Sequence, residues 1–134
     1  KPKKEIGMKN KEKDIEGIEN HEHFIDIFKE IDVLKDNLTE NTDTAFEILK
    51  MFDKNDDQES VDVLRITCSN ILDCEQLAKD KIGEYETLKE DVLKNGGNNL
   101  QQKQALEILK NLKKLETSST KQFNQLLNLS SSIK

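Results

Sequence analysis

The chain of 134 residues is long enough to form one domain with a buried core. Its 34% apolar and 36% charged residues are typical of long helices with a narrow apolar seam, and the periodic placement of the apolar residues argues against disorder throughout. The net charge of -6, the single arginine and the lack of a long apolar run argue against a nucleic-acid-binding or membrane-spanning protein.

Residues 1–13 precede the periodic part of the chain and carry six lysines against two glutamates. We expect this segment to be a flexible basic arm, followed by a single helical-bundle domain over residues 14–134. Because the sequence begins at Lys1 without a methionine, we expect one of two origins. Either the arm follows a removed signal peptide or a lipid-anchored tether, or Lys1 marks the boundary of a cloned fragment.

Three long stretches between residues 20 and 133 show apolar residues at helical spacing, and polar turns at residues 53–58 and 95–98 separate them. This pattern predicts an all-α fold, an antiparallel three-helix bundle of long helices. The first stretch keeps its register across residues 39–44, although Asn and Thr side chains there compete with the helical backbone. We therefore predict one long first helix; the alternative is a break near residues 39–44, which would give four helices.

Local signals mark the ends of the second and third helices. Asp57 or Ser60 is the expected N-cap of the second helix, and Asn98 that of the third. Gly96 predicts a left-handed residue after the end of the second helix. Gly83 lies inside that helix and costs roughly 1 kcal/mol relative to Ala, which we expect the close approach of a neighbouring helix to offset.

Folding the three helices antiparallel gives each residue a predicted height along the bundle. Three aromatic residues should meet near one end: Phe24, Phe28 and Tyr85. A second group of three residues should meet toward the opposite end: Phe46, Cys68 and Phe123.

Small polar residues fall at one height between these two groups, in residues 37–44, 75–78 and 117–120, which we call the polar layer. One hypothesis is that Thr42, Ala78 and Ser119 line a cavity for a small ligand within this layer. The alternatives are that the polar side chains point outward or satisfy one another, or that the layer is a hinge.

Two short motifs match metal-binding patterns only in part. Asp53, Asn55 and Asp57 match the first ligand positions of an EF-hand loop, but the loop then lacks its turn glycine and its bidentate glutamate. His21 and His23 are two residues apart and so project from different helical faces. The sequence therefore predicts neither a calcium site nor a zinc site.

The remaining reactive groups also lack a catalytic context. Cys68 and Cys74 would lie about 9 Å apart on a continuous helix, too far for a disulfide, so we predict two free thiols. We find neither a nucleophile paired with a base nor a Gly-rich phosphate loop. The sequence thus predicts a protein without enzymatic activity, cofactor or metal.

Charge is distributed unevenly along the chain. Residues 14–60 hold fifteen acids against four lysines, whereas residues 95–134 hold six lysines against two acids. The simplest interpretation is that the acidic first helix and the basic third helix attract each other within the bundle. The alternative is an acidic outer face that binds a partner protein, for which Glu30, Asp32 and Asp36 are the candidate residues.

In size and helix order the chain resembles the secreted three-helix allergens of mites and the helical surface lipoproteins of spirochaetes that capture host proteins. The resemblance covers the layout and carries over no residue. It implies display outside the cell. Our first hypothesis is a non-enzymatic secreted or surface protein that presents a helix face to a protein partner, and a host protein is one candidate for that partner. The alternatives are a cytoplasmic coiled-coil scaffold that forms homo-oligomers, which the free thiols favour, and a small-ligand carrier.

Overall fold

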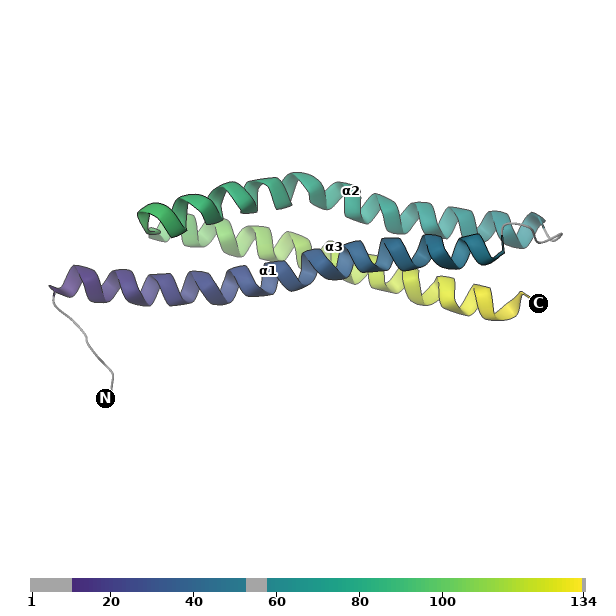
Figure 1. The fold of residues 1–134 in the computed structure, drawn as a ribbon, viewed down its shortest axis with the longest axis horizontal. Coiled ribbons are helices and arrows are strands. Elements are labelled where there is room, and N and C mark those ends of the chain that lie inside the picture. Colours follow the sequence, from purple (N-terminus) through teal and green to yellow (C-terminus); the bar gives the residue numbers. More distant parts are fainter. Residues whose placement is uncertain (1–10, 53–57, 134) are drawn as a thin grey trace.

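The computed structural model is an elongated bundle of three long helices (Figure 1). It describes the backbone of residues 11–52 and 58–133, and the side chains of these ranges from His23 onward. Helix α1 spans Lys11–Met51, α2 spans Gln58–Asn95 and α3 spans Asn99–Ser132. The helices run up, down and up, and each packs against both others, which confirms the predicted antiparallel three-helix bundle.

The first helix is continuous, so the alternative of a break near residues 39–44 is wrong. Leu38 and Ala45 are fully buried on either side of this segment and keep the helix against the core. The Thr42 hydroxyl donates to the Leu38 carbonyl at 3.1 Å, a bond that the intact helix accommodates. The helix begins at Lys11, so the last three residues of the expected arm belong to it, and residues 1–10 lie outside the described part.

The turn between α2 and α3 forms as its sequence predicts. Gly96 has a φ of +81°, and its N–H donates to the Val92 carbonyl at 2.8 Å. Asn98 caps α3: its side chain accepts from the Gln101 N–H at 2.8 Å, and the Gln101 side chain accepts from the Asn98 N–H at 3.1 Å. At the other turn Ser60 lies inside α2 and is not its cap, while Asp57 lies outside the described residues.

The buried core divides into two clusters along the bundle. The cluster nearer the α2–α3 turn contains the predicted aromatic group, with ring centroids 5.7 Å apart for Phe24 and Phe28 and 5.5 Å apart for Phe28 and Tyr85. The opposite cluster is built on these fully buried residues: Ala45, Leu64, Cys68, Ile71 and Leu126. Phe46 and Phe123 pack against it, which confirms the predicted heights.

The two cysteines are free and buried, as predicted. The Cys68 thiol donates to the Ala45 carbonyl of α1 at 3.3 Å, and burial raises its pKa to about 11. A thiol in that position stays protonated at neutral pH and behaves as a small core side chain.

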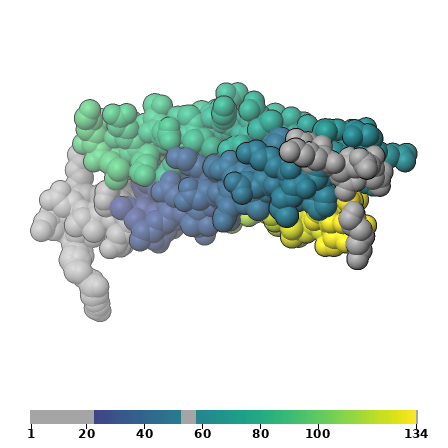
Figure 2. All heavy atoms as spheres, turned by 45° about the vertical axis from the view of Figure 1, so that its right-hand side comes forward, coloured from purple at the N-terminus to yellow at the C-terminus, as the bar shows by residue number. Residues whose placement is uncertain are grey.

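The space-filling view shows how α1 is held by the other two helices (Figure 2). One side of α1 is covered by α2, and the C-terminal part of α3 lies along another side. As with each pair of helices in such a bundle, the face of α2 and α3 that points away from α1 has no third helix over it.

Candidate functional site

The polar layer forms a connected set of hydrogen bonds between helices. From α1, the Asn37 amide donates to Glu116 at 3.2 Å, and the Asn41 amide donates to Ser119 at 3.0 Å and to Thr120 at 3.2 Å, all on α3. This layer lies between the two core clusters. The helices are therefore joined at this level by paired polar groups, and above and below it by apolar contacts.

The structure brings the predicted cavity residues to this level and buries all three. Ala78 and Ser119 are fully buried and Thr42 is nearly so. The hydroxyl of Ser119 accepts from Asn41, and that of Thr42 donates to its own helix. These contacts correspond to the alternative in which the polar side chains satisfy one another. A ligand cavity at this level stays a prediction.

The three acidic residues predicted to bind a partner do not share one environment. Glu30 lies 3.8 Å from Lys113 of α3, and Asp32 lies 3.7 Å from Lys89 of α2. Asp36 is exposed. Two of the three carboxylates therefore face lysines within the bundle. The Glu30–Lys113 pair joins the acidic first helix to the basic third helix, as the predicted attraction between them requires, whereas Asp32 faces α2.

Asp32 also contacts the most deeply buried polar group at this end of the bundle. The Tyr85 hydroxyl donates to Asp32 at 2.6 Å and lies 3.3 Å from the Phe28 carbonyl. Burial, and then the neighbouring Asp32 carboxylate, raise the pKa of Tyr85 well above its ordinary value. The phenol therefore stays neutral and donates a hydrogen bond that fixes α2 against α1.

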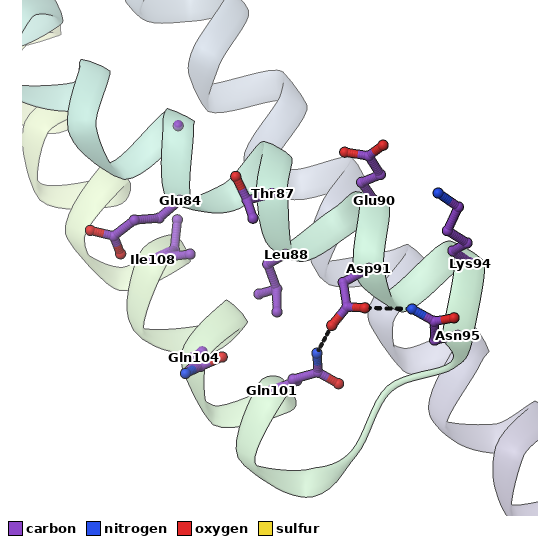
Figure 3. Close-up of a pocket in the computed structure, with 11 residues that line it drawn as sticks. Glu84, Thr87, Leu88, Glu90, Asp91, Lys94, Asn95, Gln101, Gln104 and Ile108 are labelled. Carbon is purple, nitrogen blue, oxygen red and sulfur yellow. Dashed lines mark hydrogen bonds between the residues drawn. The ribbon is translucent and has the colours of Figure 1, made fainter.

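A hollow of about 860 Å³ lies between α2 and α3, close to the turn that joins them (Figure 3). We call it the α2–α3 groove. Leu88 and Ile108 lie between the two helices, and polar side chains surround them. The lining residues are as follows: Gly83, Glu84, Thr87, Leu88, Glu90, Asp91, Lys94 and Asn95 of α2, and Gln101, Gln104 and Ile108 of α3.

The end of this groove nearest the turn is fixed by hydrogen bonds. Asp91 accepts from the Asn95 amide and from the Gln101 amide of α3, both at 2.7 Å (Figure 3). Further along, Glu84 lies 3.6 Å from Lys81. The groove is thus a shaped surface with an apolar floor and an acidic margin, suited to holding another chain's side chains.

Gly83 at the margin of the groove corrects one expectation. A Cβ built on Gly83 has no heavy atom within 4 Å, so no neighbouring helix approaches it and the expected internal compensation is wrong. Gly97 is the glycine that has no room for a side chain, because a Cβ there would lie 2.2 Å from the Phe24 ring.

Beyond the groove, three exposed apolar residues lie on the same side of α2, and we call them the outer stripe: Val63, Ile66 and Leu77. Their exposed fractions are 41%, 61% and 66%. At about 100° per residue these three side chains and Leu88 fall within a sector of about 60° around α2. The exposed Asn70, whose amide donates to Gln122 of α3 at 3.3 Å, lies between Ile66 and Leu77. The sequence signal that could have indicated this surface is the set of apolar residues Val63, Ile66 and Leu77, which share one side of the helix beside the buried residues.

Among the described side chains, those of residues 23–52 and 58–133, no three His, Cys, Asp or Glu gather as ligands for an ion. His23 is exposed, and the side chain of His21 and the EF-hand-like residues 53–57 lie outside the described part. As far as the helices are described, none combines the length and apolarity needed to span a bilayer.

Comparison with models of protein families, with curated proteins and with solved structures finds no match.

Proposed function

We propose that this chain is a non-enzymatic binding protein that presents one face of a rigid helical bundle to a protein partner. The observation that carries the proposal is the α2–α3 groove with its apolar floor and polar margin, together with the exposed apolar residues of the outer stripe. A hollowed surface with apolar residues rimmed by polar groups is typical of protein-binding sites.

The organisation of the buried polar groups supports the same proposal. Asn41, Thr42, Ser119 and Tyr85 all use their polar atoms in bonds that join or shape the helices. These groups support the shape of the bundle, which leaves binding to its exposed side chains.

We further propose that the protein works outside the cell or at its surface, where a host protein is one candidate partner. The support for this location is the resemblance in size and helix order to secreted and surface-displayed helical proteins. Protease treatment of intact cells tests it: degradation of the chain without cell lysis is the expected result, and full protection would contradict it.

Affinity capture followed by reconstitution tests the binding function. The full chain carrying a C-terminal tag is incubated with serum and with cell lysate, and each captured protein is purified and titrated against the untagged chain by calorimetry. A saturable complex of defined stoichiometry supports the proposal. The proposal fails if no purified protein forms such a complex.

Two further measurements separate the proposal from its alternatives. Sedimentation equilibrium at micromolar concentration should show a monomer, because a stable homo-oligomer would favour the scaffold. Native mass spectrometry should show the mass of the chain alone, because a copurified small molecule would favour the carrier.

A further inference from the structure

We infer that the occupant of the α2–α3 groove and the outer stripe is a basic amphipathic helix of the partner protein. The inference rests on the proposed function and adds the chemistry and shape of the bound segment. Three observations carry it: the helical walls of the groove, its charge, and the unexplained glycine at its margin.

The shape of the site fits a helix. From Leu77 to Asn95 the surface runs along α2 for about 27 Å, the length of roughly five helical turns. Its walls are the side chains of two antiparallel helices, which offer ridges and grooves to a third helix. An extended peptide would find no free backbone groups here to pair with, whereas a helix satisfies its own backbone.

The charge of the site indicates a basic occupant. The lining residues include three acids, Glu84, Glu90 and Asp91, against the single cation Lys94, and Lys81 outside the lining lies 3.6 Å from Glu84. A second copy of this chain would bring the same acids against each other, which disfavours self-association through this face. A helix with leucines on one face and lysines or arginines beside them is complementary in both respects.

Gly83 indicates how closely the occupant approaches. A glycine inside a helix weakens it, and at this position no contact within the bundle offsets the cost. Gly83 lies on α2 at the margin of the groove, where the missing side chain leaves room for a partner backbone. Filling this position should therefore strengthen the free protein and weaken its complex.

The test uses a fluorescein-labelled peptide of eighteen residues, with leucines at positions that form one helical face and lysines on the flanks. Its binding to the full chain is measured by fluorescence anisotropy. A control peptide carries glutamate in place of every lysine. We expect the basic peptide to bind at low salt, to bind more weakly as salt increases, and the acidic peptide not to bind.

Paired variants show whether the peptide sits in the groove. Gly83→Gln and Leu77→Gln should each weaken binding about tenfold, equivalent to about 1.4 kcal/mol. The matched controls, Thr117→Gln and Leu106→Gln, add the same side chain at exposed positions of α3 outside the groove lining and should bind as the wild type does. Because Gly83→Gln should also raise the melting temperature, its weaker binding could not result from unfolding.

A charge-matched pair separates the groove from general attraction between an acidic protein and a basic peptide. The double variant Glu84→Lys, Glu90→Lys should abolish binding at moderate salt. The double variant Glu40→Lys, Glu47→Lys changes the net charge equally on exposed positions of α1 and should reduce binding only slightly.

The inference is overturned if the wild type does not bind the basic peptide, or if each groove variant binds as its control does. It is also overturned if wild-type sedimentation shows a dimer that Leu77→Gln dissociates, because the occupant is then a second copy. Failure here leaves the proposed function standing if a purified partner still binds the chain. A partner whose affinity is unchanged by all the groove variants would show binding at another face.

Discussion

Replacing Gly97 with alanine should destabilise the bundle through one identifiable collision. Gly97 follows the left-handed residue of the α2–α3 turn, and an added Cβ would lie 2.2, 2.6 and 2.9 Å from three atoms of the Phe24 ring. Ordinary contact between such atoms needs at least 3.4 Å. Because Phe24 is fully buried and packs on Phe28, either the ring or the turn must move by about an ångström.

The size of the effect follows from the cost of overpacking a core. An extra methyl group that forces a buried ring out of place costs typically about 1–3 kcal/mol. With a urea m-value of about 2 kcal/mol per molar for a domain of this size, a loss of about 2 kcal/mol lowers the unfolding midpoint by about 1 M. Urea titration followed by helical circular dichroism measures that shift directly.

Two companion variants identify the collision as the cause. Phe24→Leu removes the two nearest ring atoms, so the costs of Phe24→Leu and Gly97→Ala should fail to add, with a coupling of about 1 kcal/mol or more. Gly96→Ala places a side chain at a φ of +81° with nothing within 4 Å, so it should cost about 1–2 kcal/mol through backbone strain. Phe24→Leu should not rescue it. The reasoning is refuted if Gly97→Ala unfolds at the wild-type midpoint, or if its cost simply adds to that of Phe24→Leu.

Three other changes test the polar contacts of the core. Tyr85→Phe should lose about 1–2 kcal/mol of stability in urea titration because it removes the hydrogen bond to Asp32, and a wild-type midpoint would show that the bond contributes nothing. The raised pKa of Cys68 should stabilise the fold fully below pH 9 and progressively less as pH rises toward 11, because the unfolded thiol ionises first; the slope is at most about 1.4 kcal/mol per pH unit. Cys68→Ala should remove that slope, and parallel pH curves for the two proteins would contradict the assignment. Asn41→Ala should cost about 1–2 kcal/mol because it leaves the buried Ser119 hydroxyl without its donor, and Ser119→Ala in the same background should recover part of the loss.

The fold could be predicted because its determinants are local and periodic. The spacing of apolar residues sets the helices, and the two polar turns set their order. Constant rise per residue then places Phe28 of α1 beside Tyr85 of α2, although 57 residues separate them. Caps such as Asn98 act within three residues and are equally readable.

The continuity of α1 was harder to predict because its decisive contacts are distant. Residues 39–44 are unfavourable for a helix when taken alone. In the bundle, the side-chain amide of Asn41 donates hydrogen bonds to Ser119 and Thr120 of α3, so it no longer competes for the hydrogen-bonding groups of its own backbone. Tertiary packing decides this segment, and no window of local sequence contains that information.

The groove was missed for a different reason. A helix with two neighbours has a broad apolar face, so Leu77 looks like the edge of the buried seam. In the structure Cys74 and Ala78 are buried, whereas Leu77 between them is 66% exposed and points outward. Gly83 was assigned to close packing for the same reason, because a helix wheel does not show which side of the seam carries a neighbour.

The acidic side chains of α1 show how folding and binding compete for the same residues. Reversing the charge of Asp32 would deprive Tyr85 of its carboxylate acceptor and place a second cation near Lys89, so any loss of partner binding would be mixed with loss of stability. Asp36 is exposed, so Asp36→Lys changes the surface charge without that penalty. A partner that binds the acidic face of α1 should lose affinity with Asp36→Lys at an unchanged urea midpoint. A partner in the α2–α3 groove should be indifferent to Asp36→Lys and respond to Gly83→Gln, so this pair of variants assigns the binding face.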